Sequence, residues 1–94
     1  METKYTQGPW TVDPSEARAM SGERIFKVIA DRPYGGLIAD VSAWWVDTES
    51  ARNNASLIAA APEMLAELEL LAESFGWPSD HPACIVIAKA KGDA

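Results

Sequence analysis

His81 and Cys84 are the residues best suited by type to do chemistry, because they stand three positions apart beside Asp80. An imidazole next to a thiol could form a nucleophile pair, or two ligands of a metal site projecting from one helical turn. A catalytic zinc needs three protein ligands and a structural zinc needs four, yet this chain holds one histidine and one cysteine. We therefore interpret His81 as a helix-cap residue and Cys84 as a buried apolar side chain.

Two other patterns could in principle serve catalysis. Gly35 and Gly36 lack the following lysine and helix start of a phosphate-binding loop. Four glutamates fall in one predicted helical region: Glu63, Glu67, Glu69 and Glu73. Paired carboxylates work as acid and base inside a pocket, which an exposed helix ridge does not form. The sequence thus predicts a protein that is not an enzyme and that uses no metal and no cofactor.

The charge of the chain is negative and unevenly placed. The net charge is −6, and no lysine or arginine occurs between Arg52 and Lys89, where all four glutamates lie. Direct binding to nucleic acid is disfavoured because it requires a basic footprint. The glutamates predict either a solvated outer face or an acidic ridge that binds a basic protein surface or imitates DNA phosphates.

The composition is that of one small domain. The chain has 94 residues, of which 48% are hydrophobic and 23% charged, and a single cysteine excludes an internal disulfide. We expect a flexible arm at residues 1–7 and a single domain at 8–94. The start of the chain does not resemble a signal peptide, and the apolar runs are too short to span a membrane. These features predict a soluble cytoplasmic protein.

Three segments have the character of strands. Residues 24–30 and 37–46 are rich in β-branched and aromatic residues, and the turn between them at 31–36 contains Pro33 and two glycines. They predict an antiparallel hairpin, to which residues 10–12 could add a third strand. Residues 13–23 are polar and predict a loop with room for a brief helical turn.

From Asp47 onward the apolar period becomes helical. Asp47 or Thr48 can cap the helix, and apolar residues then recur at intervals of three, four and seven as far as Phe75. Pro62 predicts a break near residues 60–62 and the start of a second helix, which Gly76 ends.

The C-terminal segment has two possible interpretations, a helix or a strand. Asp80 as N-cap, Pro82 in the first turn and Gly92 after two lysines favour a short helix. The β-branched residues within 84–88 would also suit a strand. With the helix favoured, the fold class is α+β: a small antiparallel sheet of two to three strands, packed by a proline-interrupted amphipathic helix, plus a short C-terminal helix.

Trp44 and Trp45 carry most information about surfaces, because neighbours on a strand point to opposite faces. Trp45 shares its predicted face with a wholly apolar set: Leu37, Ala39, Val41 and Ala43. This set is expected to face the helices, together with Phe26 and Val28 of the preceding strand. The outer face then holds four large apolar side chains: Ile25, Ile29, Ile38 and Trp44. That is too much apolar surface to leave in water, so either the C-terminal helix or a second chain should cover it.

The motif at residues 54–65, Asn-Ala-Ser-Leu-Ile-Ala-Ala-Ala-Pro-Glu-Met-Leu, resembles a segment of a family of small bacteriophage and prophage proteins. In that family it reads Asn-Ala-x-Leu-Ile-Ala-Ala-Ala-Pro-Glu-Leu-Leu. The Gly-Pro-Trp-Thr-Val element at 8–12, the Ile-Ala-Asp-Val strand at 38–41 and the tail at 87–92 are similar as well. The resemblance covers about half of the chain, and Trp44-Trp45 is not part of it.

This resemblance implies a setting rather than a mechanism, because the family supplies no catalytic residues to carry over. It implies a phage-derived accessory protein, and such proteins often bind and block a host protein, including defence machinery such as CRISPR effectors. We therefore expect a non-enzymatic blocker of a host macromolecule. The alternative is a structural or assembly-support protein that acts as a homodimer through the outer face of the sheet.

Overall fold

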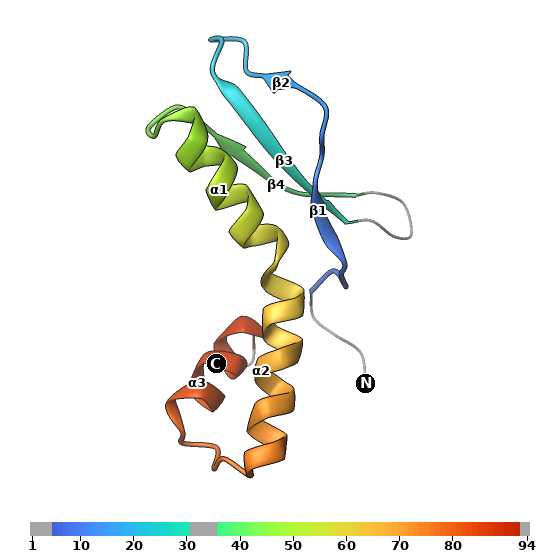
Figure 1. Cartoon of the computed structure of the whole chain (residues 1–94), viewed down its shortest axis with the longest axis vertical. Coiled ribbons are helices and arrows are strands. Elements are labelled where there is room, and N and C mark those ends of the chain that lie inside the picture. The colour runs from blue at the N-terminus through green and yellow to red at the C-terminus, as the bar shows by residue number, and fades with distance from the viewer. Residues whose placement is uncertain (1–4, 31–35, 93–94) are drawn as a thin grey trace.

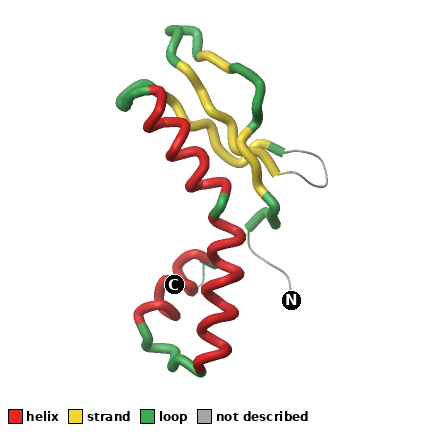
Figure 2. Tube along the Cα trace, in the orientation of Figure 1, coloured by secondary structure: helices red, strands yellow, loops and turns green. Residues whose placement is uncertain are grey.

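A computed structural model describes residues 5–30 and 36–92 and shows an elongated α+β protein measuring 48 × 29 × 20 Å (Figure 1). The elements in chain order are β1 (Trp10–Val12), β2 (Ala17–Arg18), β3 (Arg24–Ala30), β4 (Leu37–Ser42), α1 (Thr48–Ala59), α2 (Ala61–Phe75) and α3 (Pro82–Ala90). The sheet packs beside α1 at one end, while α2 and α3 form a helical hairpin at the other (Figure 2). The predicted fold class is confirmed.

The sheet is organised around β3, the longest strand. β4 pairs with it antiparallel, while β1 and β2 pair antiparallel with its two ends. The predicted hairpin and the third strand at residues 10–12 are thus confirmed, although the predicted turn lies, apart from Gly36, outside the described residues. β2 was not predicted, because a strand of two residues shows no readable alternation.

The core lies between β3 and α1. Phe26, Val28 and Ala30 alternate along β3 and are buried, as period two requires. The facing positions on α1 are Ala51, Ala55 and Ala59, all buried and four residues apart. Small side chains at this spacing let the helix approach the strand closely, and they confirm that Phe26 and Val28 point toward the helix.

β4 departs from the predicted alternation at its start. Val28 pairs with Ala39 but Ile29 pairs with Leu37, so the register shifts and one extra residue is inserted in β4. Such a bulge exchanges the faces of the residues beyond it. Ile38 consequently packs against the core, and Leu37 is 56% exposed. The prediction of Ile38 on the outer face and Leu37 on the inner face was wrong.

β4 is also shorter than predicted, because it ends at Ser42 rather than residue 46. The Trp44 N–H donates to Ser42 Oγ at 3.1 Å, a local bond that turns the chain away from the ladder. Trp44 and Trp45 therefore lie in a loop where strand alternation does not apply. The expectation that Trp45 faces the helices was wrong, since this side chain is 89% exposed.

The helix boundaries follow the predicted signals. Asp47 caps α1, with its Oδ1 accepting the Ser50 N–H at 2.7 Å. The break falls at Ala60, and Pro62 lies in the first turn of α2, where a missing N–H costs nothing. Gly76 ends α2 at φ 64°, a left-handed conformation that favours glycine.

α3 is a helix, as favoured, and it lies alongside α2 (Figure 1). The alternative in which it covers the outer face of the sheet was wrong. Neither Ala61–Phe75 nor Pro82–Ala90, both fully described, contributes a buried residue. The hairpin is therefore a pair of helices that share one contact line and have no enclosed core of their own.

The cap at Asp47 leads to a prediction about acid stability. The Ser50 N–H lowers the pKa of Asp47 below 3.8, so the folded state binds fewer protons there than the unfolded state does. Its stabilising contribution is complete above about pH 5, well above the unfolded-state pKa, and is lost as the pH falls through the lower folded-state pKa. Asp47→Ala should lower the thermal midpoint at neutral pH by a few degrees.

Asp47→Asn is the matched control, because asparagine keeps a capping oxygen but does not titrate. Its thermal midpoint, followed by circular dichroism from about pH 5 to pH 3, should fall less steeply than that of the wild type. Equal slopes would contradict the assigned role of the Asp47 carboxylate.

Candidate protein-interaction surfaces

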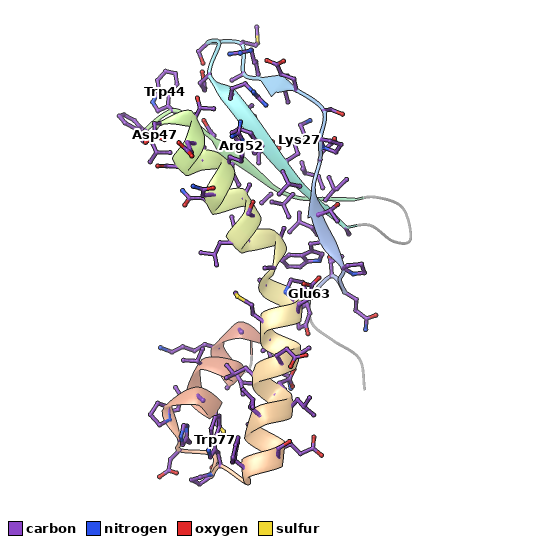
Figure 3. The ribbon with its side chains drawn as sticks, in the orientation of Figure 1. Lys27, Trp44, Asp47, Arg52, Glu63 and Trp77 are labelled. Carbon is purple, nitrogen blue, oxygen red and sulfur yellow. The ribbon has the colours of Figure 1, made fainter. Side chains whose placement is uncertain are left out.

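Most of the exposed large apolar side chains gather in two places, while Met20 and Leu37 lie apart from both. One is the tryptophan loop, which we define as residues 44–46; its side chains Trp44, Trp45 and Val46 are 55%, 89% and 42% exposed. The other is the last turn of α1 together with the α2–α3 hairpin, where the exposed large side chains are Leu57, Met64, Leu70, Leu71, Phe75, Ile85 and Val86. Figure 3 shows Trp44 and Trp77 at opposite ends of the molecule.

The tryptophan loop is held at both ends. The Ala43 N–H donates to the carbonyl of Arg24, the Trp44 N–H donates to Ser42 Oγ, and Asp47 caps the helix that follows. The rings of Trp44 and Trp45 meet edge to face, with centroids 6.0 Å apart and an angle of 81° between their planes. The loop therefore presents two mutually supported indoles to solvent on a short, anchored segment.

The predicted outer-face cluster is not assembled. Ile25 and Ile29 are half-buried on the sheet, Ile38 lies against the core, and Trp44 lies beyond the end of β4. Of the four, Trp44 is the one that is broadly exposed. The bulge and the early strand end separated these residues, and neither follows from a strict period of two.

The four predicted glutamates do not form one ridge. At about 100° per residue, Glu63 and Glu67 share one side of α2, and Glu69 and Glu73 share another about 120° away. Glu69 Oε2 accepts from Lys91 Nζ at 3.2 Å and so joins α2 to α3. The acidic row that remains on one side consists of Glu63 and Glu67, which are both exposed.

An apolar seam runs along the other side of α2. We give this name to six residues spaced by four, three, four, three and four: Leu57, Ala61, Met64, Leu68, Leu71 and Phe75. Phe75 is 68% exposed, Leu57 61%, Met64 50% and Leu71 45%. Alternating steps of three and four are the spacing by which one helix packs along another. The sequence pattern places Leu68 and Phe75 in the apolar helical stripe, which Leu57, Met64 and Leu71 widen. It does not show that the seam is exposed, because exposure is decided by tertiary packing.

Three rings stack at the turn of the hairpin. Phe75 and Trp77 lie with centroids 5.8 Å apart and planes at 14°, and Trp77 and His81 lie 4.3 Å apart at 4°. His81 caps α3, with Nδ1 accepting the Ala83 N–H at 3.0 Å. The interpretation of His81 as a helix-cap residue is confirmed, and the prediction of Asp80 as the N-cap was wrong by one residue. Cys84, which was expected to be buried, is half-buried, and its Sγ lies 4.0 Å from the Trp77 carbonyl oxygen. Both candidate chemical residues thus have structural contacts.

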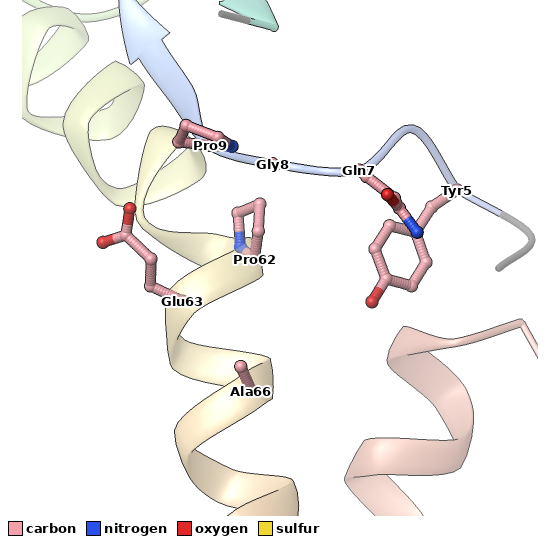
Figure 4. Close-up of a pocket in the computed structure, with 7 residues that line it drawn as sticks. All are labelled: Tyr5, Gln7, Gly8, Pro9, Pro62, Glu63 and Ala66. Atoms are coloured by element: carbon pink, nitrogen blue, oxygen red, sulfur yellow. The ribbon is translucent and has the colours of Figure 1, made fainter. Parts of the chain in front are cut away.

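The start of the described chain runs beside α2. Tyr5, Gln7, Gly8 and Pro9 border an open cavity of about 400 Å³ whose other wall is Pro62, Glu63 and Ala66 (Figure 4). The Trp10 Nε1–H donates to the Thr6 carbonyl at 3.1 Å, which ties this segment to β1. Of the predicted arm at 1–7, residues 1–4 lie outside the described part.

A second cavity, of about 360 Å³, lies beside the core, lined in part by Arg24, Arg52 and Phe26. The guanidinium carbons of Arg24 and Arg52 lie 4.8 Å and 5.5 Å from the centroid of the Phe26 ring. Two cations over one aromatic ring cover the edge of the core and stabilise it by cation–π attraction. Its lining also includes the Asp13 carboxylate, whose pKa the Ser15 N–H lowers.

Taken together, the fold and its surfaces define a small α+β protein with exposed apolar and acidic faces. Within residues 5–30 and 36–92, no three histidine, cysteine, aspartate or glutamate side chains are placed to hold a metal ion. None of the helices α1 to α3 is long and apolar enough to cross a membrane.

The family model described as Salmonella phage P22 protein Y8K6 matches residues 1–94, and the chain belongs to this family. No curated protein and no solved structure matches it. The expected relation to small phage proteins is confirmed at this level.

The close approach of Gly8 to α2 leads to a prediction. A Cβ at position 8 would lie 2.9 Å from the Cβ of Pro62, a rigid ring that cannot move aside. Gly8→Ala should therefore displace the segment and lower the free energy of unfolding in urea by about 1 kcal/mol. Gly36→Ala is the control, because a Cβ there meets no atom within 4 Å. Equal effects of the two substitutions would contradict the contact.

Proposed function

We propose that this phage-family protein is a non-enzymatic binding protein that acts in the cytoplasm of the bacterial host by occupying a surface of a host protein. The proposed target is a component of host defence, of the kind that CRISPR effectors represent. The observation that carries the proposal is the tryptophan loop, which places two large aromatic side chains in solvent at the end of the molecule.

Tryptophan is over-represented among the residues that dominate binding energy at protein interfaces. Exposed indoles on a loose segment would lose much of this energy to ordering when they bind. Here the bonds of Ala43 and Trp44 and the cap at Asp47 fix the loop beforehand, which reduces that loss. Anchored aromatic side chains of this kind support a role in recognition.

The charges support a protein partner. A net charge of −6 repels nucleic acid, and the exposed row of Glu63 and Glu67 favours a basic protein surface. The non-enzymatic assignment is supported by the structural contacts of His81 and Cys84, which serve as a helix cap and in the contact between α3 and the hairpin turn.

The tryptophan loop is tested by immobilising the protein and measuring what it captures from a bacterial lysate. Trp45→Ser should reduce capture of the partner at least tenfold, since an indole at the centre of an interface contributes about 2 kcal/mol or more. Met20→Ser is the control, because Met20 is the most exposed of the large apolar side chains described, at 108%, and lies on another loop. Equal capture by wild type and Trp45→Ser would overturn the proposal.

The acidic row is tested separately by charge reversal. Glu67→Lys should weaken capture of a basic partner mainly by slowing association, and the difference should shrink at high salt. Glu73→Lys adds the same charge to the same helix on its other acidic side, so it should have the smaller effect. Indistinguishable association rates would exclude the row as a contact.

The alternative is a structural or assembly-support protein whose role is self-association. It is favoured by the apolar seam rather than by the outer face of the sheet. In that case Trp45→Ser would leave its assembly unchanged, whereas substitutions in the seam would abolish it.

A further inference from the structure

We infer that the α2–α3 hairpin is one half of a helical bundle and that the apolar seam is occupied by a second copy of this chain. The inference stands whether or not the proposed host partner is correct, because it depends on the hairpin and not on the tryptophan loop.

The seam is long and lies on one side of the helices. Within α2 it spans 14 residue steps from Ala61 to Phe75, or about 21 Å of helix, and Leu57 continues it on α1 across the break at Ala60. Each of its six positions is apolar, and the steps of three and four keep them on one side of the α1–α2 rod. Leu57 stands two positions from both Ala55 and Ala59, so it lies on the side of α1 opposite the sheet. The sheet therefore leaves the seam open.

The chain does not cover the seam by itself. α3 has 9 residues and α2 has 15, so at about 1.5 Å per residue α3 is some 9 Å shorter than its neighbour. α3 packs on α2, and the seam residues Ala61 and Leu68 are half-buried, as are the neighbouring Leu65 and Ala72. Met64, Leu71 and Phe75 remain about half exposed or more. Two helices that enclose no buried residue need further helices to complete a core.

The area and the uncharged character of the seam favour a second copy of the chain as its occupant. The exposed parts of the seam come to several hundred Å² per chain, a large share of the roughly 800 Å² that each partner contributes to a standard stable interface. The seam carries no charge that would select a particular foreign helix. Two antiparallel hairpins related by a twofold axis would bury the same seam from both copies and form four helices.

The distribution of charge also favours a second copy of the chain over a membrane surface. An anionic membrane surface is disfavoured because the hairpin carries four glutamates against two lysines. Self-association must overcome the repulsion between two chains of charge −6, and the layout reduces it: Glu69 is paired with Lys91, and Glu63 lies away from the seam. Glu67 borders it, so raising the salt concentration should strengthen the dimer by screening.

The test is sedimentation equilibrium of the full chain and of two neighbouring variants. The wild type should be a dimer at about 100 µM and tighten with added salt. Leu71→Glu places a charge in the seam and should raise the dissociation constant at least about a hundredfold. Leu70→Glu adds the same charge one residue earlier, on the side of Glu63 and Glu67, and should remain dimeric.

Phe75→Ser keeps the proposal falsifiable if Leu71→Glu fails to fold, because Phe75 is the most exposed seam residue at 68%, and its removal costs the monomer mainly the stacking on Trp77. It should weaken the dimer at least tenfold, with an unchanged circular dichroism spectrum. A monomeric wild type, or a dimer that resists Leu71→Glu or Phe75→Ser, overturns the inference. A dimer lost instead on Trp44→Ala would place the interface at the tryptophan loop.

Discussion

The contact between the three alanines of α1 and the inner face of β3 is the constraint on which the rest of the structure depends. Ala51, Ala55 and Ala59 are almost fully buried against Phe26 and Val28, and these residues form the hydrophobic core cluster of the described part of the chain. Small side chains bring the helix close to the strand, so a modest number of residues excludes water from the centre. The guanidinium groups of Arg24 and Arg52 over Phe26 cover one edge of this contact.

This contact positions the tryptophan loop and the α2–α3 hairpin, whose side chains are less buried than those of the core. Because α1 is fixed on the sheet, the tryptophan loop that leads into α1 is held at both ends, and α2 continues from α1 as a projecting rod (Figure 1). The hairpin is attached mainly through Ala60 and the first turn of α2, and the segment that includes Gly8 lies beside that turn. One end of the protein therefore holds the core, and the other exposes side chains typical of half of a core.

The local signals of the sequence predicted most element boundaries, because they act through neighbouring residues. Asp47 caps the helix through the amide of Ser50, Pro62 affects its own turn, and Gly76 adopts a backbone conformation open to it. Two neighbouring residues were both candidates for the N-cap of α3, because His81, like Asp80, can accept a hydrogen bond from a helix N–H, and the cap is His81. The strand at Ala17–Arg18 was missed because it depends on the edge of β3 rather than on its own pattern.

The surfaces were less predictable, because they depend on events distant in the sequence. One inserted residue in β4 moved Ile38 from the expected outer face to the core, and the bond from Trp44 to Ser42 ended the strand before the tryptophans. The ion pair between Glu69 and Lys91 joins residues 22 positions apart and removes one member of the expected acidic ridge. The four apolar residues predicted to share the outer face of the sheet therefore do not form one surface. The apolar seam is the larger exposed apolar surface.

The central claim is that a second copy of the chain covers the apolar seam of α2, whereas α1 of the same chain covers the inner face of β3. Hydrogen–deuterium exchange followed by mass spectrometry over a range of protein concentrations tests this claim most directly, since it reports local protection. The account predicts that exchange in residues 61–75 slows as the concentration rises, while exchange in residues 24–30 does not change. Exchange in residues 61–75 that is independent of concentration would contradict it.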